Sequence, residues 1–318
     1  MLRPGGTARA RLPLPCRGAA ARGQAQRGAR ARGAAGCRRA PGGRMGRMTT
    51  AAPVPAPTDA PDATGLGTRR EPCELQVLDT ALIAPDTLRL GLARVDGAPV
   101  RYEPGHFCNL AIPGPQGEVW RSYSVATPLR SGEARERIEV VAAAVPGGLA
   151  TEYLFARRPG DRLRASGPFG RLLLPGEDPE YYLLMGTGTG LAPYRAMLPE
   201  IEQRAAGRAL RVTVVMGVRS PAAALYLDEF RGFVARDPQH RRLWVHYSRE
   251  LPETPAADEA AGYVQQGLPF LGLLPATTLA YLCGNPGMID AAAGWLGAAG
   301  FPRRRVVREK YQSRPTAG

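Results

Sequence analysis

The chain has 318 residues, 44% of them hydrophobic, and this length accommodates two folded domains at about 100–200 residues per domain. Its formal net charge is +14, but residues 1–48 contain twelve Arg and no Asp or Glu, so the rest of the chain holds 30 basic and 28 acidic side chains. A globular nucleic-acid-binding protein carries its basic surface on the folded part. The near-neutral remainder therefore argues against a nucleic-acid partner.

The five cysteines, Cys16, Cys37, Cys73, Cys108 and Cys283, are too widely spaced to form a zinc site or an iron–sulfur cluster motif. An odd number of scattered thiols also argues against a disulfide framework and fits a reducing compartment. No stretch approaches the roughly 18 consecutive apolar residues of a membrane-spanning helix. We therefore expect a soluble, cytoplasmic protein with no metal site.

Residues 1–70 consist mostly of Arg, Gly, Ala and Pro. Such a segment cannot bury enough apolar surface to offset the entropy lost on ordering, so we expect a disordered extension and linker. The Arg-rich start is similar to an organelle transit peptide, but it lacks Ser enrichment and an amphipathic period. An upstream extension of the reading frame, with Met45 or Met48 as the working start, is the favoured interpretation.

Residues 71–176 are expected to form a small antiparallel β-barrel domain. Short apolar runs separated by Gly, Pro and Asp are typical of strands joined by turns, and six of them at this spacing favour a barrel. The runs are 73–80, 87–92, 106–113, 121–126, 137–145 and 171–175, with one helix-compatible stretch at 149–155.

Residues 177–318 alternate between apolar runs and helical stretches, which predicts a parallel-sheet α/β domain. Strands that are apolar throughout are typical of a sheet buried on both faces. The apolar runs are 181–186, 211–217, 242–248 and 278–284, and the helical stretches are 192–206, 222–234 and 286–299.

A glycine-rich segment, Gly186-Thr187-Gly188-Thr189-Gly190, lies between the first of these strands and its helix. Glycines let the backbone approach a ligand closely, and a helix N-terminus suits a pyrophosphate. The segment lacks the Lys-Ser/Thr of a nucleoside-triphosphate loop and does not match GxGxxG. By itself it favours a dinucleotide site, while a simple tight turn stays open as an alternative.

Four segments in a fixed order, RSYS at 121–124, GGLAT at 147–151, GTGTGLAP at 186–193 and CGNPGM at 283–288, resemble the ferredoxin-NADP(+) reductase superfamily. The resemblance extends from about residue 73 to residue 311. It implies a two-domain protein, with a flavin-binding β-barrel holding FAD followed by an α/β dinucleotide-binding domain holding NADP(H).

The resemblance also implies an activity. A monomeric flavoprotein would transfer a hydride between NADPH and flavin N5, and would pass single electrons to or from a separate ferredoxin or flavodoxin. Two alternatives stay open: the reductase component of an oxygenase system using NAD(P)H, and a catalytically silent flavin-binding interaction module.

The resemblance assigns flavin-binding residues in the barrel. Arg121 would pair with the flavin diphosphate, Tyr123 would cover one face of the isoalloxazine, and Ser124 would hydrogen-bond near N5. The Thr151 hydroxyl and the backbone at the start of the 149–155 helix would contact the phosphates. The full set is Arg121, Ser122, Tyr123, Ser124, Gly148, Leu149, Ala150, Thr151 and Tyr311.

A second set would bind the nicotinamide dinucleotide. Arg219 and Arg249 each follow a strand of the sheet and would bind the 2′-phosphate of NADPH, and Tyr226 would stack on the adenine. Where some relatives carry a further Arg after a Gly, this chain has Gly262-Tyr263. The full set is Thr187, Gly188, Thr189, Gly190, Arg219, Ser220, Tyr226, Ser248, Arg249, Gly284, Asn285 and Met288.

The residues expected at the reacting rings are Ser124, Cys283, Glu309 and Tyr311. By resemblance, the Cys283 thiol would lie beside nicotinamide C4, the Glu309 carboxylate would lie near the flavin, and the Tyr311 ring would stack on the other flavin face. Without Gly284-Asn285-Pro286 after it, a small buried side chain would be the preferred interpretation of Cys283. The chain continues with residues 312–318 where many relatives end, so the position of Tyr311 stays open.

Overall fold

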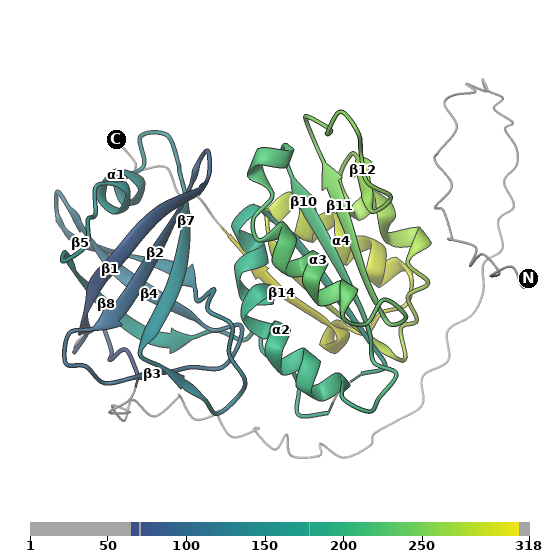
Figure 1. Ribbon diagram of the computed structural model, residues 1–318, viewed down its shortest axis with the longest axis horizontal. Helices are drawn as coiled ribbons and strands as arrows, with labels where there is room; N and C mark the ends of the chain where they lie inside the picture. The colour runs from purple at the N-terminus through teal and green to yellow at the C-terminus, as the bar shows by residue number, and fades with distance from the viewer. Residues whose placement is uncertain (1–64, 70, 178, 312–318) are drawn as a thin grey trace, which may run out of the picture. The chain divides into compact units, whose positions relative to one another are not determined.

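A computed structural model describes residues 65–69, 71–177 and 179–311 (Figure 1). These residues all belong to one compact unit, Ala60–Gly318. The expected disordered extension and the working start at Met45 or Met48 lie outside the described residues. None of the helices in the described part of the chain combines the length and apolar composition that a membrane crossing requires.

The first half of this unit is an antiparallel β-barrel, as predicted. One sheet contains six strands in the order β5-β4-β8-β1-β2-β7. A bridge between Val125 and Val140 joins the two ends of the sheet and closes it. The strands are β1 (Cys73–Ala84), β2 (Thr87–Arg94), β4 (Phe107–Gly114), β5 (Gly117–Ser124), β7 (Arg137–Ala143) and β8 (Arg162–Phe169), with β3 (Val100–Arg101) paired to β6 (Ala134–Arg135) and helix α1 at Leu149–Phe155.

One predicted barrel strand is wrong and a different segment takes its place. Residues 171–175 form no strand; Leu172 and Leu174 instead pack in the core of the α/β domain. The sixth long strand is β8, where buried Leu163 and Ala165 alternate with Arg162 and Arg164 on the outside. Residues 171–175 follow the barrel but pack against the α/β domain. They therefore have the apolar composition of a strand although they pair with no other strand.

The second half is a parallel sheet of the order β12-β11-β10-β9-β13-β14. Its strands are β9 (Tyr181–Thr187), β10 (Arg211–Val218), β11 (Arg241–Tyr247), β12 (Glu259–Ala261), β13 (Thr278–Gly284) and β14 (Val306–Lys310). The connecting helices are α2 (Ala192–Ala205), α3 (Leu227–Ala235) and α4 (Pro286–Ala298), with short 3-10 turns η1 (Gly188–Leu191), η2 (Pro221–Ala223), η3 (Val264–Phe270) and η4 (Arg303–Arg305). Sequence analysis missed β12 and β14.

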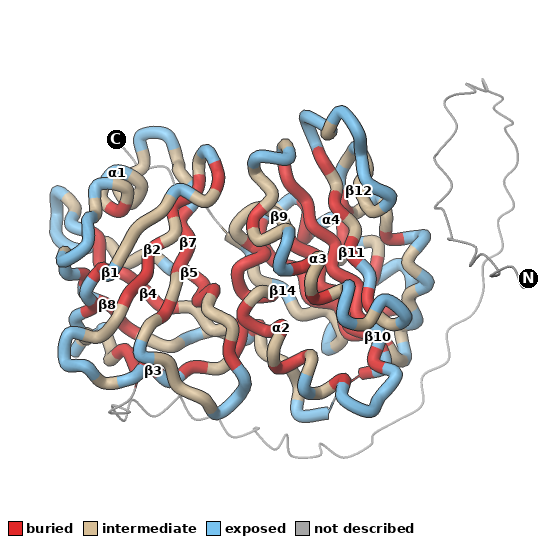
Figure 2. Tube along the Cα trace, in the orientation of Figure 1, coloured by how far each residue is buried: buried red, intermediate tan, exposed pale blue. Residues whose placement is uncertain are grey.

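Helices cover both faces of this sheet. Buried residues of α2 and α3, including Tyr194 and Phe230, pack on one face. Residues of α4 and η3, including Ile289 and Leu268, pack on the other. Figure 2 shows buried residues concentrated in the strands between these layers. The carboxyl ends of the parallel strands are thereby held at one edge, where open α/β sheets bind ligands.

The helix predicted over 222–234 begins later than expected. Residues 221–223 form the turn η2, and α3 starts at Leu227. Tyr226, the residue just before α3, has a left-handed backbone with φ of 56°. This conformation is uncommon for a residue other than Gly. Because it is not helical, the helix cannot include Tyr226 and starts only after it.

Candidate functional site

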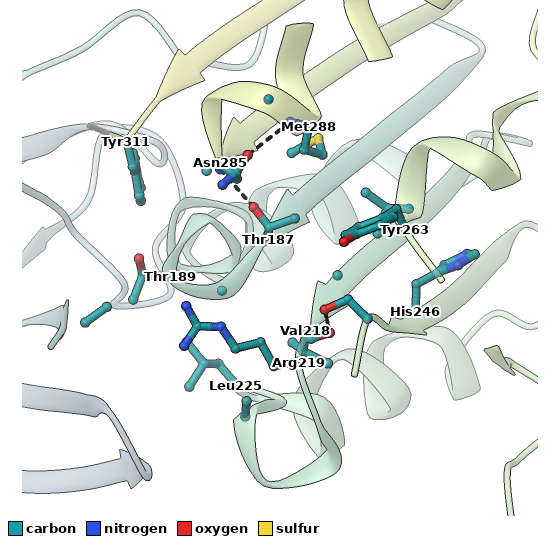
Figure 3. A pocket seen from close by; sticks show the side chains of 18 of the residues that line it. Thr187, Thr189, Val218, Arg219, Leu225, His246, Tyr263, Asn285, Met288 and Tyr311 are labelled. Carbon is teal, nitrogen blue, oxygen red and sulfur yellow. Dashed lines mark hydrogen bonds between the residues drawn. The ribbon is translucent and has the colours of Figure 1, made fainter. Parts of the chain in front are cut away.

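A cavity of about 870 Å³ lies at the carboxyl ends of β9, β10, β11 and β13 (Figure 3). Its wall includes most of the residues expected to bind a dinucleotide, as well as Asp86 and Thr87 from the barrel and the unforeseen Tyr263. The expected residues among its lining are Thr187, Gly188, Thr189, Arg219, Ser248, Gly284, Asn285, Met288 and Tyr311. Gly190, Ser220, Tyr226 and Arg249 are not part of the lining.

Two glycines of the GTGTG segment serve different purposes. Gly188 has φ of +54°, and a Cβ on it would have no neighbour within 4 Å, so its backbone faces open space where a ligand can approach. A Cβ on Gly190 would lie 2.5 Å from the carbonyl oxygen of Cys283. The glycine at 190 is therefore required by packing of the turn against β13, while the one at 188 suits close contact with a ligand.

The CGNPGM segment lines the cavity beside the glycine-rich segment. The Asn285 N–H donates to the Thr187 hydroxyl (2.9 Å), and the Asn285 side chain accepts from the Met288 N–H (3.1 Å) as the N-cap of α4. Figure 3 shows both bonds, of which the one to Thr187 joins the two segments. The segment thus ties the end of β13 to the end of its neighbour β9 at the edge of the cavity.

The two arginines expected to bind the 2′-phosphate differ in position. Arg219 lines the cavity, and its guanidinium lies 3.3 Å from the carboxylate of Asp86, in the turn between β1 and β2. The Arg249 N–H donates to the Arg219 carbonyl (3.1 Å), but the Arg249 side chain is exposed and does not line the cavity. The structure therefore brings one arginine to the cavity and leaves the other outside its lining.

Aromatic side chains near the cavity are arranged differently from the prediction. The Tyr226 ring lies beneath the Arg195 guanidinium, 4.3 Å from ring centroid to carbon, and packs against the barrel. Tyr263 lines the cavity and is 60% exposed, so a flat ligand can reach its ring. The sequence analysis mentioned Tyr263 only because some relatives carry an arginine there. An aromatic residue that follows a glycine at the end of a strand could have indicated a stacking position.

The four residues expected at the reacting rings do come together. The Ser124 hydroxyl, at the end of β5, lies 2.5 Å from the Tyr311 hydroxyl and donates to the Glu309 carboxylate at 3.3 Å. Glu309 is paired in register with Cys283 across β13 and β14, and the Tyr311 N–H donates to the Gly284 carbonyl at 2.9 Å. This cluster joins a barrel residue to three residues of the α/β domain.

Burial dominates the electrostatics of this cluster. It raises the pKa of Glu309 to about 7, against the opposing effect of the hydrogen bond from Ser124. Burial likewise raises the pKa of the Cys283 thiol and of the Tyr311 hydroxyl well above their usual ranges. At neutral pH the thiol and phenol are therefore neutral, and Glu309 is the group of the cluster that can exchange a proton.

Two barrel residues expected to hold a flavin, Arg121 and Tyr123, lie on strand β5. Arg121 makes one hydrogen bond within the described chain, to the Trp120 carbonyl at 3.2 Å, which leaves most of its N–H donors available. Tyr123, on the same face of β5, is partly buried against the barrel core. A guanidinium with donors to spare, beside an aromatic ring, fits a ligand that carries phosphates and a flat ring system.

The remaining flavin candidates have local partners. The Ser122 hydroxyl donates to Asn109 (2.7 Å), and the Thr151 hydroxyl accepts from the Val145 N–H (2.8 Å), closing the turn before α1. A Cβ on Gly148 would meet the Val145 carbonyl at 2.9 Å, so this turn requires the glycine. Leu149 and Ala150 pack against the barrel core.

Comparison with known proteins agrees with both halves of the site. Residues 74–173 match the oxidoreductase FAD-binding domain family, and residues 184–294 match the oxidoreductase NAD-binding domain family. The chain is 32% identical over 249 residues to ferredoxin–NADP reductase B of Sorangium cellulosum, covering 76% of this chain and 98% of the relative.

Other relatives extend the comparison. The toluate 1,2-dioxygenase electron transfer component of Pseudomonas putida is 28% identical over 72% of this chain, which spans only 64% of that relative. The crystal structure of an Amycolatopsis cytochrome P450 reductase superposes with a TM-score of 0.66 at 29% identity, over 78% of this chain and 74% of that one. The chain therefore belongs to the ferredoxin–NADP reductase family of oxidoreductases with FAD- and NAD(P)-binding domains.

Proposed function

We propose that this chain is a ferredoxin–NADP reductase, which uses FAD to exchange a hydride with NADPH and single electrons with a separate carrier protein. The observation that carries the proposal is the cluster of Ser124, Glu309 and Tyr311, where a barrel residue contacts two α/β residues beside the dinucleotide cavity. The near-complete coverage of the Sorangium relative supports the same function.

The barrel residues would bind and orient the flavin. The Arg121 guanidinium would donate charge-assisted bonds to the diphosphate, and Tyr123 would cover the ring. When bound, the flavin supplies two-electron chemistry toward a nicotinamide and one-electron chemistry toward a carrier. The work of this chain is then to place two rings in contact and to exclude water.

The α/β residues would bind the coenzyme and manage a proton. Arg219 presents the cation that a 2′-phosphate requires, and the exposed Tyr263 ring offers a stacking surface. Glu309, with its pKa near 7, would hold or release a proton through the Ser124 hydroxyl at neutral pH. The Tyr311 phenol contacts Ser124, so it would have to shift for a nicotinamide to reach the flavin.

An anaerobic titration tests the flavoprotein function. The purified protein should be yellow, and NADPH should bleach it; a colourless protein would instead favour the silent interaction module. Arg121→Ala should release most of the flavin during gel filtration, because charge-assisted bonds contribute about 1.5–3 kcal/mol. Arg164→Ala, which removes an exposed barrel arginine paired with Glu118, is the control. Full flavin retention in Arg121→Ala would refute the role of Arg121.

The electron acceptor decides between the two enzyme functions. A ferredoxin- or flavodoxin-coupled cytochrome c reduction assay should show NADPH-dependent turnover. The similarity to a dioxygenase electron transfer component makes an oxygenase reductase the second candidate. Turnover that requires an oxygenase and is absent with ferredoxin and flavodoxin would establish that candidate instead.

A further inference from the structure

A largely buried arginine on α2, Arg195, connects the two domains, with 13% of its side chain exposed. The Arg195 guanidinium donates to the Glu139 carboxylate on β7 of the barrel (2.8 Å) and to the Ala126 carbonyl just after β5 (3.0 Å). The side chains of Arg195 and Glu139 are only 13% and 16% exposed. Ion pairs that are this far from water are screened little and have a fixed geometry.

The same guanidinium also contacts residues next to the wall of the coenzyme cavity. Its Nε donates to Glu229 on α3 (2.8 Å), and its plane lies over the Tyr226 ring. Tyr226 directly follows Leu225, which lines the cavity. One side chain therefore contacts the neighbour of a cavity-lining residue on one side and the barrel on the other.

On the barrel side the contact is part of a larger network. Glu139 also accepts from Arg89 on β2 (2.8 Å), and Arg89 in turn pairs with Asp79 on β1 (2.7 Å). Arg195 and Arg89 hold the pKa of Glu139 below its usual range, although burial alone would raise it. Glu139 is therefore an anion fixed to three strands of the barrel, a rigid anchor for Arg195.

The positions along the chain relate this contact to the reacting groups. Arg195 is in the first turn of α2, directly after the glycine segment that ends at Gly190. The carbonyl that it binds belongs to Ala126, two residues after Ser124. Arg195 therefore joins the segment that follows β5 to the start of the helix after the glycine-rich turn.

We propose that Arg195 is a positioning residue for hydride transfer, which clasps the coenzyme cavity to the flavin barrel through Glu139 and the Ala126 carbonyl. The inference rests on the family's pairing of two cofactors and holds for NADPH and NADH alike. Hydride transfer requires the reacting atoms about 3–3.5 Å apart, and a misplacement of about 1 Å can cost about 100-fold in rate.

Anaerobic stopped-flow reduction tests the clasp. In Arg195→Met the limiting rate of flavin reduction should fall at least about tenfold, while the coenzyme Kd changes less than about threefold. The long-wavelength absorbance that arises when bound NADP(+) contacts the reduced ring should weaken. Hydrogen exchange over residues 221–226 should accelerate in the variant even without coenzyme.

A matched control separates positioning from stability. Arg241 is also buried and has the same kinds of partner, the Glu202 carboxylate (3.0 Å), the Phe233 carbonyl (2.9 Å) and the Phe233 ring (4.2 Å), all within the α/β domain. Arg241→Met should lower the melting temperature but leave the limiting rate and the long-wavelength absorbance unchanged.

A second variant keeps the proposal testable if Arg195→Met does not fold. Glu139→Gln removes the ion pair between Arg195 and the barrel, while Arg195 keeps Glu229 and the Ala126 carbonyl, and it should slow flavin reduction in the same direction. Flavin reduction in the double variant should be no slower than in the slower single variant, because both substitutions remove the same Arg195–Glu139 ion pair. A normal limiting rate in a folded variant, or a loss confined to coenzyme Kd, would overturn the proposal.

Discussion

Replacing Glu309 with glutamine should abolish a pH dependence of stability that the wild-type cluster imposes. Burial raises the pKa of this carboxyl from 4.5 to about 7. The folded chain therefore binds the proton more tightly than the unfolded chain does, so the group's contribution to stability is full below pH 4.5 and is lost as pH rises through about 7.

The size of the effect follows from the two pKa values. Between pH 5 and pH 8.5 the free energy of unfolding contributed by Glu309 should fall by about 2.5 kcal/mol, at 1.36 kcal/mol per pKa unit. A glutamine has no proton to lose and can still accept from Ser124. Relative to wild type, Glu309→Gln should therefore gain about 2.5 kcal/mol of stability on going from pH 5 to pH 8.5.

Urea unfolding of the flavin-free protein at the two pH values measures this difference. The control is Glu118→Gln, which removes an exposed carboxyl of the barrel. The pH dependence of its stability should be the same as that of wild type. If the difference in stability between Glu309→Gln and wild type is the same at pH 5 and pH 8.5, the carboxyl is solvated and the reasoning from burial is refuted.

Three further substitutions test other parts of the site. Gly190→Ala should lower stability by about 1–3 kcal/mol in thermal melts, because its Cβ meets a backbone carbonyl of β13; unchanged stability would show that the loop relaxes freely. Tyr311→Ser should tighten coenzyme binding and relax the preference for NADPH over NADH, measured by titration. Asp86→Asn should lower the KM for NADPH up to about fivefold by freeing Arg219, with no such change in an Arg219→Ala background; an equal change for NADH would exclude a phosphate effect.

The sequence predicted best the strands that are buried along nearly their whole length. Strands β9 and β13 are buried along nearly their whole length, so their apolar runs marked both position and parallel pairing. Strand β8 was missed because Arg162 and Arg164 face outward and a Gly-Pro pair lies near its end. Strand β14 was missed because it is short and carries charged residues at the edge of the sheet.

The site shows the same division. The cluster around Glu309 was anticipated through resemblance, and the register of β13 with β14 explains its geometry. Its raised pKa follows from packing between two domains, which no local pattern encodes. The position of Tyr226 was not foreseen, because its ring is held by Arg195, a residue distant in sequence. Contacts between domains are the part of this molecule that sequence periodicity could not supply.

The place where β5 and β7 close the barrel has a consequence for the protein's tendency to aggregate. Strand β5 pairs with β4 along its length, but it meets β7 only through the Val125–Val140 bridge and the bond from the Ala126 N–H to the Glu139 carbonyl. An open strand edge invites pairing with other chains. A flavin bound by Arg121 and Tyr123 would lie against β5 and hold it in place, so we expect FAD supply to affect aggregation of this protein as well as its activity, with the flavin-free form the one that self-associates.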